Sequence, residues 1–280
     1  MNNYNLNGFV KQRGITLIEL MTGLLIGLLV VAAALSSVIF TRSAQVTQSD
    51  SARIHQQASY VIRTIGLQLR QAGAVEMVNA ADGKVTFDTR YTGVNDAQDV
   101  IVSGTDGGGT NPDVLNVSAQ DQRSTSVPGF PAGTSTVRDC LGNAPDAALI
   151  GIRLQNSFSV NVAQQSLMCT GANTATGPQA IAAGVEDFQV RYGVATPGFT
   201  DLDQQLQYVA TPPSFVSSSA SSFRAVQICI RLVGDRAQTT TGTGNAVVGC
   251  NGEVVPTDGR IRRVFTSTYF LRNAVRVGQF

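Results

Sequence analysis

The sequence has little charge and no tryptophan. Charged residues make up 14% of its 280 residues, whereas a soluble enzyme of this length usually carries nearer a quarter. Histidine occurs once, at His55, so a Ser-His-Asp triad would have to use that residue. No C-x-x-C pair is present, which argues against a zinc ribbon or a thioredoxin-type redox site. These shortages point away from catalysis, and we expect neither a cofactor nor a metal.

The charges that are present balance. Outside residues 1–40, which hold Lys11, Arg13 and Glu19, 18 basic and 18 acidic residues remain. A neutral body gives no electrostatic reason to expect nucleic acid as a partner. Glycine, serine, threonine and asparagine are plentiful, which is typical of β-rich, loop-rich exported proteins.

One long apolar run stands near the N-terminus. Residues Ile15 to Phe40 include a single ionisable side chain in 26 positions. A helix of that length reaches roughly 39 Å, more than the ~30 Å hydrocarbon core of a bilayer. Lys11 and Arg13 precede the run, so the positive-inside rule places the N-terminus in the cytoplasm and the rest of the chain outside. The run is too long for the core of a conventional secretory signal, and hydropathy alone indicates an uncleaved signal anchor.

Glu19 is the exception inside this run. A carboxylate in a membrane helix costs on the order of 2.5–3.5 kcal/mol on insertion scales, so it is a functional candidate that needs a positive partner. No Lys or Arg follows within the run before Arg42. The nearby candidates are therefore Lys11, Arg13, or a new amino terminus made by cutting the chain.

The sequence RGITLIEL at residues 13–20 resembles the cleavage and methylation motif of type IV prepilins and type II secretion pseudopilins. The resemblance implies that the prepilin peptidase removes residues 1–14 by cutting between Gly14 and Ile15, and that Ile15 is then N-methylated. It also implies that Glu19, the fifth residue of the mature chain, neutralises the amino terminus of a neighbouring subunit during assembly. The family usually has phenylalanine where this chain has Ile15, a departure that bears on methylation more than on cleavage.

A helical pattern continues past the apolar run. Apolar residues recur at three- and four-residue steps between residues 50 and 72, which predicts an amphipathic face turned toward a core. Gly73 is a suitable helix stop. We therefore expect one helix from Ile15 to about Ala72, with residues 15–40 in the membrane and 41–73 amphipathic. Gly23, Gly27 and Gly66 are its expected weak points, and His55 is expected to be a surface residue.

Residues 74–280 predict a periplasmic β-rich body, so that the fold class is α+β, a long N-terminal helix packed on an antiparallel β-sheet domain. Period-two alternation of apolar and polar residues, broken by Gly/Pro/Asn/Asp clusters, is the signal. The predicted strands are Lys84–Asp88, Val114–Ser118, Leu149–Leu154, Phe158–Val162, Val185–Tyr192, Ala225–Leu232 and Arg263–Leu271. Loops are expected at 104–112, 124–135, 171–178, 196–222 and 237–246.

Four cysteines lie on the predicted extracytoplasmic side: Cys140, Cys169, Cys229 and Cys250. They allow three pairings. We favour Cys140 with Cys169 and Cys229 with Cys250, because sequence neighbours would staple two loop-bearing segments. Four free thiols are disfavoured in an oxidising periplasm.

Two further segments carry grouped charges. Residues 106–113 offer oxygen atoms and glycines that could hold calcium, but they lack EF-hand spacing, so an ordinary loop is favoured. A basic run follows near the C-terminus, and we expect a solvated strand face pairing with acids elsewhere rather than a site for DNA or an acidic partner. The run comprises Arg260, Arg262, Arg263, Arg272 and Arg276.

The body resembles the PilW-type minor pilins. The resemblance rests on five segments in the family's order: IRTIGLQLRQAG (62–73), DVLNV (113–117), DCLG (139–142), GVEDFQVRYG (184–193) and DGRIRRVFTSTYFLRN (258–273). It implies a low-abundance subunit near the pilus tip that primes assembly with other minor pilins and the major pilin, and presents a tip adhesin. The prepilin peptidase and an inner-membrane assembly platform would be its other partners.

Three other functions remain open at this stage. A J-type pseudopilin of type II secretion shares much of this architecture. A tip subunit that binds a surface ligand directly could use a long loop such as 196–222. An anchored periplasmic enzyme has no residue set to support it. In each pilin case the chain is a single-pass inner-membrane protein before assembly and part of a filament afterwards.

Overall fold

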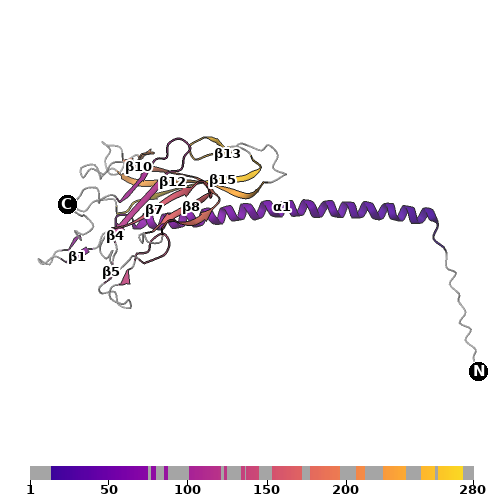
Figure 1. Ribbon diagram of the computed structural model, residues 1–280, viewed down its shortest axis with the longest axis horizontal. Helices are drawn as coiled ribbons and strands as arrows, with labels where there is room; N and C mark the ends of the chain where they lie inside the picture. The colour runs from indigo at the N-terminus through magenta and orange to yellow at the C-terminus, as the bar shows by residue number, and fades with distance from the viewer. Residues whose placement is uncertain are drawn as a thin grey trace, which may run out of the picture. The chain divides into compact units, whose positions relative to one another are not determined.

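The computed structural model describes residues 14–74, 77–79, 85–87, 101–120, 123–124, 134–135, 137–144, 153–171, 177–195, 206–211, 223–237, 247–255 and 258–273. These residues form one helix, α1 (Leu17–Gln71), and the strands β1 to β15 (Figure 1). The chain divides after Ser49 into two compact units, Met1–Ser49 and Asp50–Phe280, and α1 contributes to both.

Helix α1 confirms the predicted long helix, with both ends within two residues of expectation. At its start the Thr16 carbonyl accepts hydrogen bonds from the backbone N–H groups of Glu19 (3.1 Å) and Leu20 (3.2 Å). At its end Gly73 adopts φ +72°, a left-handed conformation that suits glycine, and its N–H donates to Ser118 O at 2.9 Å. The predicted stop at Gly73 is therefore confirmed, and none of the helix glycines interrupts α1.

Two antiparallel sheets make up most of the second unit. The first has four strands in the order β11-β10-β12-β15, and the second has five in the order β3-β4-β7-β8-β9. The strands of the first sheet are β10 (Val185–Ala195), β11 (Leu206–Val209), β12 (Phe223–Ala237) and β15 (Arg260–Phe270). The strands of the second are β3 (Val102–Thr105), β4 (Val114–Gln120), β7 (Arg153–Asn161), β8 (Ser166–Thr170) and β9 (Gln179–Ala183).

Three two-stranded pairs complete the strands. They are β1 (Met77–Asn79) with β2 (Val85–Phe87), β5 (Arg123–Ser124) with β6 (Thr134–Ser135), and β13 (Val247–Val248) with β14 (Val254–Val255). All pairings in the described residues are antiparallel. The α+β class with antiparallel sheets is thus confirmed.

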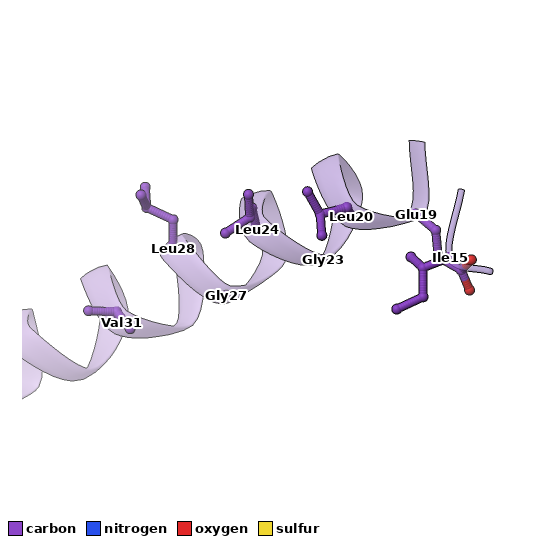
Figure 2. A pocket seen from close by; sticks show the side chains of 8 residues that line it. All are labelled: Ile15, Glu19, Leu20, Gly23, Leu24, Gly27, Leu28 and Val31. Atoms are coloured by element: carbon purple, nitrogen blue, oxygen red, sulfur yellow. The ribbon is translucent and has the colours of Figure 1, made fainter. Parts of the chain in front are cut away.

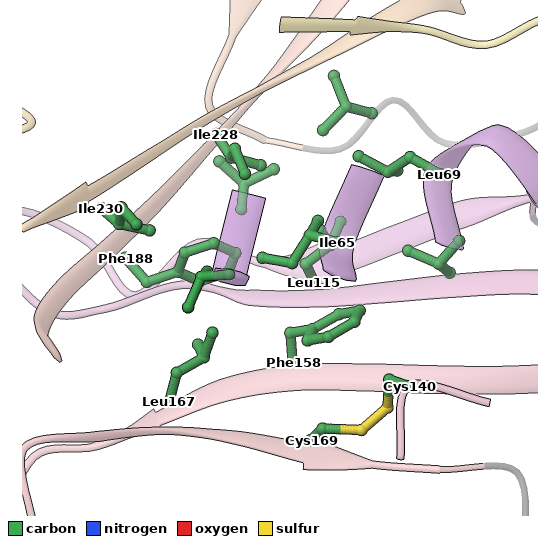
Figure 3. Packing of buried hydrophobic residues seen from close by; sticks show 14 of the residues in the cluster. Ile65, Leu69, Leu115, Cys140, Phe158, Leu167, Cys169, Phe188, Ile228 and Ile230 are labelled. Atoms are coloured by element: carbon green, nitrogen blue, oxygen red, sulfur yellow. A yellow bond between two sulfur atoms is a disulfide. The ribbon is translucent and has the colours of Figure 1, made fainter. Parts of the chain in front are cut away.

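The core joins the second part of α1 to both sheets. Figure 3 shows Ile65 of α1 together with Ile228 and Ile230 of β12, Phe158 of β7 and other buried side chains. These four named residues are at most 1% exposed. Burying a side chain of this size contributes roughly 1.5–3 kcal/mol, so this cluster supplies the main stabilisation of the unit. The predicted helical stripe is buried throughout: Ile54, Ala58, Val61, Ile65, Leu69 and Ala72.

Strand β15 runs alongside α1 in the same direction. His55 meets Phe265 edge to face with ring centroids 5.3 Å apart, and Asn273 Nδ2 donates to Ala72 O at 3.1 Å. From His55 to Ala72 the chain advances 17 residues, which span about 26 Å at ~1.5 Å per helical residue. From Phe265 to Asn273 it advances 8 residues, which also span about 26 Å at ~3.3 Å per extended residue. This match of lengths explains why the helix segment 62–73 and the C-terminal segment 258–273 form one packing unit.

Gly66 is a packing position against Tyr269. A Cβ added there would lie 2.5 Å from Tyr269 Cε1, so the absence of a side chain lets the tyrosine ring lie against the helix. From that position the Tyr269 hydroxyl donates to the Ile62 carbonyl at 2.6 Å. The close approach of Tyr269 thus gives Gly66 a packing role that the sequence pattern had not indicated.

The other strand predictions are confirmed with changes in length. Leu149–Leu154 and Phe158–Val162 correspond to the single strand β7, and residues 149–152 lie outside the described residues. Several expected loops contain short strands: 104–112 begins with the end of β3, 124–135 includes parts of β5 and β6, and 196–222 contains β11. These strands are too short to show a clear alternation of apolar and polar residues in the sequence. They are recognised only by their pairing with other strands. Strands β8 and β9 were not predicted.

Candidate functional site

The first unit presents an apolar helix surface. From Ile15 to Phe40 the large apolar side chains are at least 48% exposed. An 18-residue window of α1 has a mean hydropathy of 2.6, and none of it is buried within the structure. By length and composition this part of α1 fits a membrane span. Together with the motif at residues 13–20 it fits a single-pass inner-membrane pilin.

A groove runs along this helix surface (Figure 2). Ile15, Glu19, Gly23, Gly27 and Val31 follow one another at four-residue steps and so lie in one row along the helix. No atom lies within 4 Å of a Cβ added at Gly23 or Gly27, so the row is hollow in its middle. The neighbouring row bounds the groove with Leu20, Leu24 and Leu28.

This groove has the form that a second helix needs. Rows at four-residue spacing form the ridges and grooves by which helices pack, and small residues allow close backbone approach in a membrane. Glu19 stands at one end of the groove beside Ile15 (Figure 2). Within the described part of the chain the Glu19 carboxylate has no hydrogen-bond or ion-pair partner; Lys11 and Arg13 lie outside that part. The groove thus combines an apolar surface with one available carboxylate.

Two disulfide bonds hold the second unit, and they join the cysteines that the sequence paired. Cys140 bonds to Cys169 with Cα atoms 6.3 Å apart, which links the loop 137–144 to β8. Cys229 bonds to Cys250 with Cα atoms 5.8 Å apart, which links β12 to the β13–β14 turn. Each contributes roughly 3–4 kcal/mol in the chain-entropy description.

The loop 137–144 is also held by hydrogen bonds to α1 and β7. Asn156 Oδ1 accepts from the Cys140 N–H at 3.1 Å, and Asn156 Nδ2 donates to Gln68 Oε1 at 2.8 Å. Gln68 Nε2 in turn donates to Arg138 O at 3.1 Å. Because these groups are buried, each bond offsets a desolvation cost. The DCLG segment at 139–142 therefore has a structural role.

An ion-pair cluster covers one side of the four-stranded sheet. Arg262 donates to Glu186 with Nε–Oε2 at 2.8 Å and Nη2–Oε1 at 2.9 Å, and it also pairs with Asp258 at 2.6 Å. Arg231 pairs with Glu253 and approaches Glu186 at 3.4 Å. The alternation of apolar and polar residues in β12 predicts only that Arg231 is a polar position. Its ion-pair partners depend on which strands pair with β12 and in which register.

In the C-terminal basic run, some arginines have hydrogen-bond or ion-pair partners and others are exposed to solvent. Arg262 is paired as above, and Arg260 Nε donates to Gly234 O at 2.7 Å. Arg263 and Arg272 are exposed, and Arg276 lies outside the described residues. Pairing of the run with acids on β10 and in the 258–259 turn agrees with the expected solvated face.

Arg262 makes the stability of the body depend on pH. Its hydrogen bonds hold the pKa of Asp258 well below the usual range. The stability from this pair is therefore fully present above the ordinary Asp pKa and is lost as the pH falls. We expect Arg262→Gln to lower the unfolding midpoint at pH 7 and to flatten its decline between about pH 4 and pH 2.

Thermal unfolding of the full chain at several pH values measures this effect. Arg263→Gln is the matched control, because Arg263 neighbours Arg262 but is exposed. We expect the control to keep the wild-type profile. An Arg262→Gln profile parallel to that of the wild type would contradict the role given to Asp258.

The segment 106–113 is an anchored loop. The Asp113 carboxylate, 3% exposed, accepts from the Gly107 N–H at 2.9 Å and from the Val190 N–H at 2.7 Å. Burial raises the pKa of Asp113, and these two bonds act against that rise. In the described residues no group of His, Cys, Asp and Glu side chains is arranged to hold a metal. His55 is exposed on α1, as expected.

Comparison with known proteins identifies two family models in this chain. The model of the type IV pilus-assembly protein W matches residues 155–273, and the prokaryotic N-terminal methylation motif matches residues 10–35. The first range contains the segments 184–193 and 258–273, whereas the other three segments precede it. No curated protein matches the chain.

Among solved structures, a type IV-like pilin from Thermus thermophilus is similar to this chain. The two share 14% sequence identity with a TM-score of 0.42, over 80% of this chain and 98% of the other.

The two family models occur in the order that the sequence predicted. The methylation motif covers Gly14, Ile15 and Glu19, and the second model covers strands β8 to β15 and all but the first two residues of β7. Both families point to a structural rather than a catalytic protein and to interaction with other pilus components. Together the two matches support a PilW-type minor pilin.

Proposed function

We propose that this chain is a low-abundance subunit that primes type IV pilus assembly and packs with other minor pilins near the pilus tip. The observation that carries the proposal is the groove on α1. It offers an exposed apolar row, two unfilled glycine positions and one carboxylate at its end. The matched family, named for pilus assembly, supports a pilus over a secretion pseudopilus.

Processing is the first step of this proposal. The prepilin peptidase cuts between Gly14 and Ile15, and Ile15 is then N-methylated. Gly14 lies before the helix, is exposed, and has open space around it, so this peptide bond is accessible to an enzyme. The new amino terminus then stands four residues before Glu19.

Charge neutralisation drives the second step. Glu19 of one subunit pairs with the amino terminus of its neighbour. Two unit charges 4 Å apart attract by about 4 kcal/mol at an effective dielectric constant of 20. This attraction is comparable to the ~2.5–3.5 kcal/mol cost of a lone carboxylate in the membrane. Pairing therefore removes a penalty that the unassembled subunit carries in the bilayer.

Helix packing completes the interface. A neighbouring pilin helix inserts a ridge of side chains over Gly23 and Gly27, between the leucine row and the far side of the groove. Before assembly the N-terminus is cytoplasmic and the body is periplasmic. An inner-membrane platform then moves the subunit into the filament, where its body lies near the tip and contacts an adhesin.

Filling the groove tests the packing step. Gly27→Leu adds a side chain into open space, so the chain itself should fold and be processed as before. We expect its recovery in sheared filaments, relative to the membrane pool, to fall by about tenfold, because the ridge of the neighbour no longer fits. Immunoblots of both fractions measure the ratio.

Gly27→Ala is the matched control. Alanine is small enough to keep the close approach, so its recovery should stay near that of the wild type. Normal incorporation of Gly27→Leu, with the mature terminus at Ile15, would contradict the groove as a packing surface while leaving the cleavage site intact.

A further inference from the structure

A second recess lies at the four-stranded sheet, beside β10 and β11. Four segments form it: the loop 106–113, the consecutive strands β10 and β11, and the β13–β14 turn. Asp106, Gln189, Arg191, Tyr208 and Asn251 contribute its polar and aromatic groups. Its volume is about 440 Å³, within the range of small-molecule sites.

The walls of this recess are fixed before any ligand binds. Asn251 Nδ2 donates to Gly109 O at 2.7 Å across 142 residues of sequence. Gln189 Nε2 donates to Asn111 O at 2.9 Å and to Asp187 Oδ1 at 2.8 Å. The bond between Cys229 and Cys250 anchors the turn that carries Asn251. A preorganised site of this kind loses little entropy on binding.

The groups that remain available include both donors and acceptors. The Arg191 side chain is exposed and makes no ion pair within the described part of the chain. Asp106 uses Oδ1 to accept from the Gly108 N–H, which leaves Oδ2. In the bonds above Gln189 uses both of its amide N–H groups and Asn251 uses one of its two. One Asn251 N–H then remains as a donor, and the two amide carbonyl oxygens remain as acceptors.

The lining side chains of the recess carry no net charge, which disfavours strongly ionic ligands. Asp106 and Arg191 carry opposite charges, so an anion would face the carboxylate and a cation would face the guanidinium. Hydroxyl groups suit both neighbours, because each donates one hydrogen bond and accepts others. Tyr208, 36% exposed, adds an aromatic side chain with an apolar body and a polar tip.

We propose that this recess binds a neutral saccharide of one or two sugar units. Sugar hydroxyl groups pair with Arg191, Asp106 and Asn251, and an apolar C–H face of the ring packs on Tyr208. The inference does not depend on assembly through α1, since it concerns only residues of the body. Loss of binding and loss of incorporation are therefore separate results.

A glycan array followed by calorimetric titration with methyl glycosides tests the proposal. The full-length chain is used, in a detergent without a sugar head group so that the detergent does not compete. We expect neutral saccharides to bind the wild type, and Arg191→Ala and Tyr208→Ala to weaken binding by about tenfold each. Asp106→Asn, which keeps an acceptor for Gly108, should weaken it several-fold.

Arg63→Ala and Tyr60→Ala are the matched controls, since both residues are exposed on α1 and lie outside the recess. They should leave the affinity within about twofold of the wild type. Unchanged unfolding midpoints would show that the recess variants fold. Three results would overturn the proposal: no saccharide bound, only charged saccharides bound, or equal losses in the controls.

Discussion

Glu19→Ala is expected to lower the incorporation of this subunit into pili by one to two orders of magnitude. The variant leaves the neighbouring amino terminus unpaired in an apolar surrounding, at a cost on the order of 2.5–3.5 kcal/mol. Since 1.4 kcal/mol is a factor of ten, that cost corresponds to roughly a hundredfold at its middle value. The measurement is the ratio of the chain in sheared filaments to the chain in membranes.

Processing is the internal control for this variant. The Glu19 side chain has no partner in the described chain, so its loss should leave α1 and cleavage after Gly14 unchanged. Mass spectrometry should therefore find Ile15 as the methylated N-terminus in both proteins. Because alanine is less costly than glutamate in lipid, membrane insertion should not decrease.

Two conservative variants separate charge from shape. Glu19→Gln keeps the shape and loses the charge, so it should resemble Glu19→Ala. Glu19→Asp keeps the charge on a shorter side chain, so it should retain part of the incorporation. Equal recovery of Glu19→Gln and the wild type would exclude the charge pair as the basis of assembly.

Gly104→Ala is expected to have the largest effect on the stability of the body. A Cβ at this position in β3 would lie 2.2 Å from Val114 O and 2.4 Å from the Tyr192 hydroxyl. The first contact is with the backbone of the paired strand, so side-chain rotation cannot relieve it. We expect a loss of about 3 kcal/mol or more, or a failure to fold.

The unfolding midpoint of the full chain, with disulfides intact, measures this loss. A decrease of roughly 6–12 °C corresponds to 3 kcal/mol at ~2–4 °C per kcal/mol for a domain of this size. Ser103→Ala, next to it in β3, is the matched control and should change the midpoint little. Tyr192→Phe should not rescue Gly104→Ala, because the contact with Val114 O remains. A rescue would show that the hydroxyl alone causes the conflict.

The local parts of the fold could be read from the sequence. The apolar run, the stripe from Ile54 to Ala72 and the stop at Gly73 depend on residues close together in the chain, so periodicity and turn chemistry suffice to predict them. The longer strands, such as β10 and β12, were found for the same reason. Short strands such as β11 were missed, because two to five residues carry too little alternation.

The candidate sites divide in the same way. The motif around Gly14, Ile15 and Glu19 is contiguous, so the sequence alone determined where an assembly site should be sought. Composition also limited the cysteine pairing to three choices, and the favoured one occurs in the structure.

Only the tertiary structure decided the contacts between distant residues. The order of strands in the sheet brings Glu186 to Arg262, and the close approach of Tyr269 gives Gly66 its packing role. Four separate segments meet at the recess that holds Tyr208. Their physical basis is packing, since a side chain's partners depend on which strands pair and how closely backbones approach. The periodicity of a short segment predicts on which face of a helix or strand a residue lies. The residues that this face contacts are determined only when the chain folds.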